Sequence, residues 1–199
     1  EKILFRKLLK RAKKIHVLSR YNQIELQKIC PEIKDRILLC PGAPARNLAS
    51  NDAKTENSEN QVTKLLCVAR IHPRKGQDQV LKAIENLPSN LKKNLECLFV
   101  GPVVKKSFYE KLRTRAMKIG CTVTFLGDLE DRELKSVYQF SDIFILTSMP
   151  RANSVEGFGF VYLEASSHGL PILAHRIGGV EDAIKDGETG ILTNLEKPE

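Results

Sequence analysis

The sequence predicts an α/β fold built on a doubly wound parallel sheet. Short apolar runs alternate along the chain with segments of helical periodicity, and these runs are apolar throughout instead of alternating with polar residues. Such runs are typical of parallel strands covered on both faces, and ligands of these sheets bind outside the carboxyl ends of the strands. Strands are expected at residues 15–19, 36–40, 64–69, 95–101, 122–127, 143–148, 171–175 and 190–193.

Two stretches between the expected strands have the spacing of amphipathic helices. Residues 77–87 and 108–119 repeat apolar side chains at intervals of three and four, which places those side chains on one face of a helix. Each helix would therefore cover part of the sheet.

The segment 41–62 interrupts this alternation. It is rich in Pro, Asn, Ser and charge and poor in large apolar residues, which is typical of a linker or a long surface loop. The residues before it supply two strands and two helices, too little to bury a core of their own. We therefore expect the tail of an amino-terminal domain at 1–42, a hinge at 43–62, and a second domain at 63–199 that is cut from a longer protein at its carboxyl end.

Composition limits the class of protein. The chain has 199 residues, of which 42% are hydrophobic, enough for one globular domain with a buried core. No apolar run approaches the roughly 18 to 20 residues of a membrane-spanning helix, and the first residues lack the apolar core of a signal peptide, so a cytoplasmic protein is expected. The five cysteines are odd in number and widely spaced, which favours reduced thiols over a metal site or a disulfide framework.

Positive charge is concentrated at the start of the chain. Residues 1–14 hold seven Lys or Arg residues against the single acid Glu1, within a net charge of +8. Because apolar residues interleave with these cations, the segment predicts an amphipathic helix. A solvated helix that covers a sheet is the favoured interpretation. A helix at the cytoplasmic membrane face remains an alternative, and a nucleic-acid partner is not expected because no binding motif accompanies the charge.

The first group of chemically informative residues is VARIHPRKG, at positions 68–76. Arg70 and Lys75 lie on one loop after a strand and before a helix, and two such cations suit a diphosphate because guanidinium and ammonium both bind phosphate oxygens. Two exposed loop cations without function are the alternative. Arg74 is equally basic but has no assigned role, and His72 is interpreted as an ordinary loop histidine.

The second group is EGFGFVYLE, at positions 156–164, which opens a helix after a strand. Gly157 and Gly159 allow backbone amides to approach a ligand closely, and the free amides of a helix start bind anions. Glu156 would repel phosphates, so it is expected to accept hydrogen bonds from neutral hydroxyls, and the same holds for Glu164. Alternatively, Glu156 balances the helix dipole and Glu164 is an ordinary helix former.

These motifs together resemble a known family. The ordered blocks VARIHPRKG, LFVG, TFLGDL, IFILTS and EGFGFVYLEASSHGLPILAHRIGGVEDAIKDGETGIL are similar to the carboxyl-terminal domain of retaining GT-B glycosyltransferases of family four. The similarity spans about residues 13–193, and its core is a Glu-x7-Glu motif at Glu156 and Glu164. It implies a Rossmann-like donor-binding domain preceded by a remnant of the amino-terminal GT-B domain.

The resemblance implies a role for each matching residue. Arg70 and Lys75 would bind the diphosphate of the donor and stabilise it as it leaves, and Glu156 would contact the hydroxyls of the donor sugar. These three residues are the expected catalytic group. Glu164 would bind the ribose. Further donor contacts are implied for Gly101, Leu129, Gly157, Phe158, Gly159 and Phe160.

The function implied is sugar transfer from a nucleotide diphosphate sugar to a saccharide or lipid-linked acceptor, with retention of configuration and without a metal or cofactor. The acceptor would be held by the missing amino-terminal domain, so this chain alone is expected to be inactive. A catalytically idle nucleotide-sugar-binding module and a GT-B sugar-nucleotide epimerase remain alternatives. A dinucleotide oxidoreductase is disfavoured because no G-x-G-x-x-G loop follows a strand.

Overall fold

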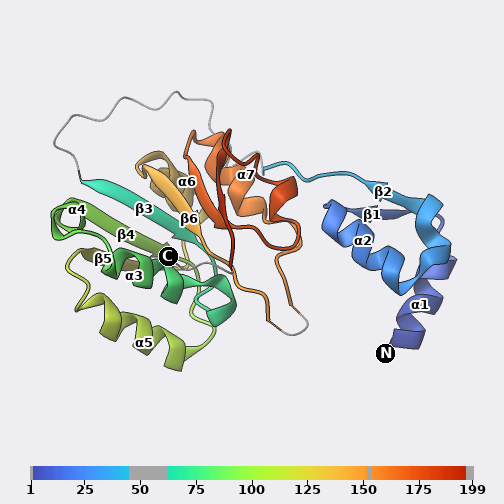
Figure 1. The fold of residues 1–199 in the computed structure, drawn as a ribbon, viewed down its shortest axis with the longest axis horizontal. Coiled ribbons are helices and arrows are strands. Elements are labelled where there is room, and N and C mark those ends of the chain that lie inside the picture. The colour runs from blue at the N-terminus through green and yellow to red at the C-terminus, as the bar shows by residue number, and fades with distance from the viewer. Residues whose placement is uncertain (1, 45–61, 152–153, 196–199) are drawn as a thin grey trace.

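The computed structural model describes residues 2–44, 62–151 and 154–195. Figure 1 shows a smaller unit at the amino-terminal end and a larger α/β unit, joined by the segment after the second strand. The two units contain separate hydrophobic clusters. The helices in the described part of the chain are all too short or too polar to traverse a lipid bilayer.

The larger unit is built on one parallel sheet of six strands in the order β5-β4-β3-β6-β7-β8. The fold class expected from the apolar runs is therefore confirmed, and each expected strand is present with ends shifted by three residues or fewer. The strands are β3 Thr63–Val68, β4 Leu95–Val100, β5 Thr122–Gly127, β6 Ile143–Leu146, β7 Ile172–His175 and β8 Gly190–Thr193.

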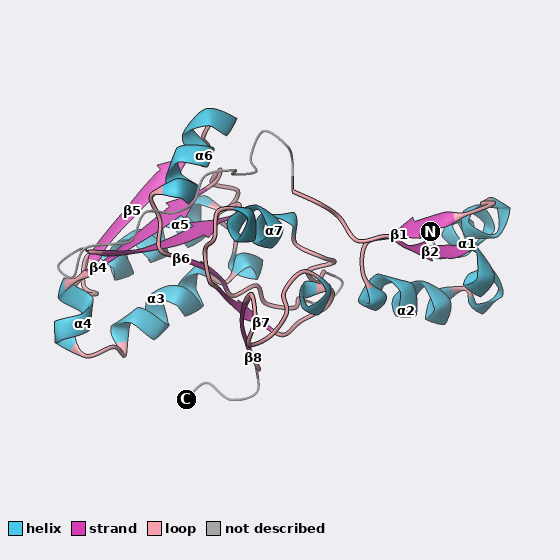
Figure 2. Cartoon of the chain, turned by 90° about the horizontal axis from the view of Figure 1, so that it is seen from above, coloured by secondary structure: helices cyan, strands magenta, loops and turns pink. Residues whose placement is uncertain are grey.

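Helices cover both faces of this sheet (Figures 1 and 2). The chain moves outward from β3 to β4 and β5, then returns to β6 and moves outward in the other direction. Because crossover connections are right-handed, the helices before and after this reversal lie on opposite faces. They are α3 Gln77–Glu85, α4 Ser89–Lys93 and α5 Lys106–Ala116, followed by α6 Asp131–Gln139 and α7 Phe160–Ser167.

The core of the larger unit lies between the central strands and these helices. Leu66, Phe99 and Phe144 on neighbouring strands have essentially no exposed surface, and Val80 and Leu81 of α3 are equally buried. The apolar spacing predicted for residues 77–87 is thus used to cover the sheet. Burial of such side chains contributes roughly 1.5 to 3 kcal/mol each, which fixes the strands whose ends carry the site.

The smaller unit has a parallel two-stranded sheet of its own. Val17, Cys30, Ile33 and Ile37 form a buried cluster beside it, which is more core than the sequence predicted for this segment. Leu9 of the first helix packs on that cluster, whereas Ile3, Leu4, Phe5 and Leu8 of the same helix are 45 to 75% exposed. The elements are α1 Lys2–Arg11, β1 Ile15–Val17, α2 Arg20–Ile29, a 3-10 turn at Pro31–Arg36, and β2 Ile37–Leu39.

Candidate functional site

The two motifs found in the sequence meet at the reversal point of the sheet. β3 and β6 are adjacent and parallel, but the chain leaves β3 toward β4 and leaves β6 toward β7. The loops after their carboxyl ends therefore lead away in opposite directions, and the crevice at this point is where open α/β sheets bind ligands. Residues 69–76 form one of these loops, and residues 147–151 and 154–159 belong to the other.

Close backbone contacts lock the two loops together. Gly76 has a φ of 70°, and a side chain there would lie 1.9 Å from the carbonyl oxygen of Thr147. The Thr147 hydroxyl donates to the Gly76 carbonyl at 2.9 Å, and the Met149 amide donates to the Arg74 carbonyl at 2.7 Å. Only glycine fits this left-handed, crowded position, so Gly76 fixes Lys75 against the second loop.

Lys75 and Glu156 form an ion pair across the crevice. The Lys75 Nζ atom lies 2.5 Å from Oε2 of Glu156, and Nη1 of Arg74 lies 3.5 Å from the same oxygen. The Ser148 hydroxyl donates to it at 3.2 Å. The side chains of Lys75 and Glu156 are only 14% and 13% exposed, so water screens this pair weakly.

The pKa of Glu156 reflects these neighbours. Burial alone would raise it, but the Lys75 ammonium, the Arg74 guanidinium and the Ser148 hydroxyl outweigh burial and hold the pKa below its usual value. The carboxylate is therefore ionised at neutral pH. The sequence predicted that Glu156 accepts hydrogen bonds from neutral hydroxyls and indicated no partner within the chain, whereas the structure pairs it with Lys75 and with Arg74, which had no assigned role.

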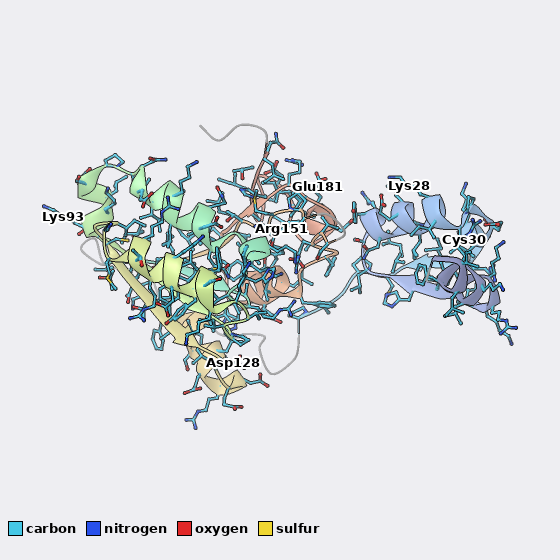
Figure 3. All side chains as sticks on the ribbon, turned by 90° about the horizontal axis from the view of Figure 1, so that it is seen from below. Lys28, Cys30, Lys93, Asp128, Arg151 and Glu181 are labelled. Carbon is cyan, nitrogen blue, oxygen red and sulfur yellow. The ribbon has the colours of Figure 1, made fainter. Side chains whose placement is uncertain are left out.

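Arg70 lies at the same loop but on a more exposed side. It lines a pocket of about 260 Å³ together with Lys75, and the other lining residues are His72, Arg74, Val104, Arg151 and Ser154. The Gln77 side-chain amide donates to the Arg70 carbonyl at 3.0 Å, which anchors its backbone. Arg151, labelled in Figure 3, adds a further cation to this pocket from the second loop.

His72 is not built as a general base. Its Nδ1 accepts a hydrogen bond from the Arg74 amide at 3.1 Å. Burial, followed by the charges of Arg74, Arg151, Arg70 and Lys105, lowers the pKa of this imidazole. The interpretation of His72 as a loop histidine agrees with this geometry.

The second motif begins α7 as the sequence predicted. Gly159 is the residue before the helix and has a φ of 90°, a left-handed conformation that favours glycine. Phe158 is buried and Phe160 is 42% exposed, and their rings meet edge to face with centroids 5.4 Å apart. The first amides of α7 consequently lie on the same loop as Glu156 and can approach an anion.

Glu164 is the fifth residue of α7 and is partly exposed. Its Oε2 accepts a hydrogen bond of 2.9 Å from the hydroxyl of Tyr138 on α6. Burial raises the pKa of the Glu164 carboxyl, the bond from Tyr138 lowers it, and the nearby charge of Asp131 raises it again, with a net increase. Glu164 is therefore a carboxylate held by a second helix.

Gly101 and Leu129 lie just after neighbouring strands, Gly101 after β4 and Leu129 after β5. Gly101 has a φ of 132°, and a side chain there would lie 2.4 Å from the Ala69 carbonyl oxygen. The glycine is thus required by packing of the β4 end onto the backbone beside Arg70. Leu129 is partly buried and packs against the main core.

The smaller unit touches the second loop directly. The Ser19 hydroxyl donates to the Gly157 carbonyl at 2.6 Å, and the Asn22 side-chain amide donates to the same carbonyl at 3.2 Å. Nearby, the Arg20 amide donates to Asp182 at 2.8 Å. The start of α2 is therefore part of the support of the EGFGF loop.

Sequence reasoning missed several of these contacts. Ser19, Asn22 and Ser148 are polar residues of ordinary type, and Tyr138 fits an apolar helix face, so no local pattern marked them. Arg74 was visible as a cation but had no distinguishing signal beside Lys75. Only the helix-start position of Ser19 could have been recognised, because serine is a favoured cap.

Among the described residues, no three His, Cys, Asp or Glu side chains are grouped as a metal site requires. The expectation that the chemistry needs no metal or cofactor stays a prediction. Cations such as those of the crevice form strong, charge-assisted hydrogen bonds with phosphate oxygens.

The fold and this crevice define a Rossmann-like α/β domain with a candidate anion-binding site at its reversal point. The family model of glycosyl transferases group 1 matches residues 50–199. The chain belongs to this family, and the resemblance to GT-B glycosyltransferases seen in the motifs is confirmed.

Curated relatives of the chain are glycosyltransferases. It is 33% identical over 135 residues to the GDP-mannose-dependent alpha-(1-6)-phosphatidylinositol monomannoside mannosyltransferase of Mycolicibacterium smegmatis, covering 65% of this chain and 34% of the relative. It is 34% identical over 176 residues to the D-inositol 3-phosphate glycosyltransferase of Corynebacterium efficiens, covering 82% of this chain and 40% of the relative. The chain thus spans well under half of each relative.

Solved structures show the same fold. Anabaena HepE in complex with UDP and glucose aligns with a TM-score of 0.77 at 22% identity, over 97% of this chain and 52% of that chain. WaaG, a glycosyltransferase involved in lipopolysaccharide biosynthesis, aligns with a TM-score of 0.75 at 22% identity, over 92% of this chain and 49% of that chain. At this identity the likeness concerns the fold.

Proposed function

We propose that the protein transfers a sugar from a nucleotide diphosphate sugar to a saccharide or lipid-linked acceptor with retention of configuration, and that this chain supplies the donor site. The observation that carries the proposal is the crevice at the reversal point of the sheet. There, the Lys75 and Glu156 side chains meet at 2.5 Å, Arg70 lines the same pocket as Lys75, and the loop that carries Glu156 leads into α7. Phosphate-binding and hydroxyl-binding groups are thus adjacent.

The chemistry follows from these groups. Cleavage of the bond between the sugar and the diphosphate builds negative charge on the leaving oxygen, and cations held in place beforehand lower that barrier. Arg70 and Lys75 supply this charge in the proposal, without a metal. Glu156 stays ionised and accepts hydrogen bonds from the sugar hydroxyls. Its contact with Lys75 fixes the sugar-binding group relative to the phosphate-binding group.

The name of one relative supports a nucleotide-sugar donor, and the lengths of both support an acceptor site outside this chain. One relative is named for GDP-mannose and a phosphatidylinositol mannoside, and another for inositol 3-phosphate. Because this chain spans 34% and 40% of their lengths, we place acceptor binding in an amino-terminal domain. The basic helix α1 has exposed apolar side chains. The proposal therefore includes contact of this helix with an anionic membrane surface.

Calorimetric titration tests the donor site. GDP-mannose and UDP-glucose are titrated into the protein, together with GDP, UDP and the bare nucleosides. If Arg70 and Lys75 bind the diphosphate, the double variant Arg70→Ala, Lys75→Ala should lose far more affinity for the diphosphates than for the nucleosides. Charged hydrogen bonds contribute about 1.5 to 3 kcal/mol each.

Lys82→Ala is the matched control, because Lys82 is an exposed cation on α3. Equal losses for diphosphates and nucleosides in the double variant would refute the assignment. An assay of the longer protein then separates the rivals, because an epimerase converts the donor sugar without an acceptor and an idle module makes no product.

A further inference from the structure

Two buried tyrosines of the larger unit satisfy their hydroxyls in different ways. Tyr138 on α6 and Tyr162 on α7 both have no exposed surface, and a buried hydroxyl without a partner is costly. Tyr162 donates to a backbone carbonyl, that of Leu146, at 3.2 Å. Tyr138 instead donates to the Glu164 carboxylate at 2.9 Å. A structural partner is sufficient for a buried tyrosine, so the choice of a carboxylate needs its own explanation.

The ring of Tyr138 is rigidly held. It stacks on His168 with centroids 5.2 Å apart and an angle of 9° between the planes, and on Phe144 at 6.2 Å and 29°. Burial and the charge of Glu164 raise the pKa of this phenol, so it is protonated and acts as the donor. The hydroxyl therefore has one fixed position beside α7.

Glu164 gains a fixed position from this contact. A partly exposed glutamate on a helix has several rotamers, and ordering its side chain on ligand binding costs conformational entropy. The bond from Tyr138 holds Oε2, and a carboxylate has further acceptor capacity on its second oxygen. Oε1 is then the oxygen available to a diol.

We propose that Tyr138 is a positioning residue that selects Oε1 of Glu164 as the acceptor for the ribose hydroxyls of the donor nucleotide. This inference rests on the proposed function, because it assumes a nucleotide in the crevice, and on the ribose contact that the family resemblance implies for Glu164. It adds that ribose recognition depends on a buried helix α6 residue that touches no ligand.

The test compares ribose with dideoxyribose on the same variant. GDP and UDP, and their 2′,3′-dideoxy forms, are titrated calorimetrically into wild-type protein, Tyr138→Phe and Tyr162→Phe. Tyr138→Phe removes one oxygen and keeps the ring in its stack. We expect this substitution to lower the affinity for the ribonucleotide about three- to tenfold, which corresponds to the loss of one hydrogen bond. The affinity for the dideoxynucleotide should fall less than twofold. Tyr162→Phe should leave the ratio of the two affinities at its wild-type value.

The ratio of the two affinities is insensitive to folding effects, because a lower folded fraction reduces the apparent affinity for both ligands alike. In a Glu164→Ala background, Tyr138→Phe should cause no further loss of ribonucleotide affinity. Equal weakening of both ligands by Tyr138→Phe, or a wild-type protein that binds both forms equally, overturns the inference. If the wild-type protein binds neither GDP nor UDP, the donor site itself is wrong, a different failure that removes the inference with it.

Discussion

Lys75 and Glu156 are the residues whose pairing most constrains the crevice. Removing two charges from water is unfavourable, and a buried ion pair often contributes little net stability. Here the pair is 14% and 13% exposed and shares its carboxylate with Arg74 and Ser148. In the proposed function the pairing has a purpose, because a cation and an acceptor are both needed at one point, and the Lys75 ammonium helps to hold the pKa of Glu156 below its usual value.

The two acids of EGFGFVYLE should have separable effects. Glu156 is bonded to Lys75 in the crevice, whereas Glu164 is bonded to Tyr138 on the side of α6. Glu156→Gln should reduce sugar transfer by the longer protein more than it weakens binding of GDP or UDP, because Glu156 contacts the sugar in the proposal. Glu164→Ala should weaken even the sugar-free nucleotides, by about tenfold, the equivalent of one charged hydrogen bond. Paired rate and calorimetric measurements that gave the opposite order would reverse these roles.

Glu156 also predicts a dependence of stability on pH. Its folded pKa lies below its usual value of 4.5, so the ionised form stabilises the fold at pH values above 4.5, and this contribution is lost as the pH falls through the folded pKa. Glu156→Gln should therefore reduce the free energy of unfolding at pH 7 by about 1 to 3 kcal/mol. The difference from wild type should shrink below pH 4.5.

Urea unfolding at pH 7, 5 and 4 measures this difference. Glu188→Gln, which changes a carboxylate whose side chain is 70% exposed, is the matched control and should show little change at any of these values. A Glu156→Gln penalty that stays constant across the range would contradict the assigned pKa.

At the scale of elements, the start of α2 links the smaller unit to the second loop. As a helix cap, the Ser19 hydroxyl accepts a hydrogen bond from the backbone amide of Asn22 at 3.1 Å. It also donates to the Gly157 carbonyl at 2.6 Å. One hydroxyl thus fixes both the helix start and the loop that follows Glu156. The position of α2 is consequently coupled to the amides proposed to close on the donor.

Substitutions at α2 test this coupling. Ser19→Ala should lower stability by about 1 kcal/mol through loss of the cap and weaken GDP-mannose or UDP-glucose binding by releasing the Gly157 carbonyl. Asn22→Ala should weaken binding with a smaller loss of stability, since its side chain bonds to the loop and is not the helix cap. Lys28→Ala, at a 66% exposed position of the same helix, should change neither. Thermal unfolding and calorimetry measure both effects; a Ser19→Ala variant of reduced stability and unchanged affinity would exclude the coupling.

The elements themselves were largely predictable, and the contacts between them were not. Apolar runs such as residues 95–100 and the helical spacing of residues 77–85 report burial directly, because period and hydrophobicity are local properties. The bond from Tyr138 to Glu164 joins residues 26 apart, and the bond from Ser19 to Gly157 joins residues 138 apart. No periodicity encodes such pairings, which depend on how helices pack.

The candidate site shows the same division. The positions of Arg70 and Glu156 after strands β3 and β6 placed both at the carboxyl edge of the sheet, since parallel strands end together. The residue types alone could not show that the Glu156 side chain pairs with those of Lys75 and Arg74. That outcome depends on Gly76, whose contact with Thr147 brings the loops together.

At the scale of the whole molecule, binding and transfer should separate. The groups proposed to bind the donor lie on the larger unit, around one sheet with its own core, and two contacts from α2 support the second loop. The chain spans only 34% and 40% of the relatives named for transfer. Donor binding should therefore be a property of this chain, while catalysis requires an acceptor held against the donor.

The consequence is that the 199-residue chain should bind a nucleotide or its sugar conjugate and show no acceptor-dependent turnover above background. An acceptor hydroxyl must be held about 3 to 3.5 Å from the reacting carbon, and such placement supplies roughly 7 to 11 kcal/mol of the barrier. In the proposal, the residues that provide this placement belong to the amino-terminal domain, and the two strands of the smaller unit cannot replace it. Product formation is measured with radiolabelled GDP-mannose or UDP-glucose and a panel of saccharide and lipid-linked acceptors, with the longer protein as the positive control. A saturable rate from the 199-residue chain would show that acceptor binding resides within it and would end the division of labour between the two domains.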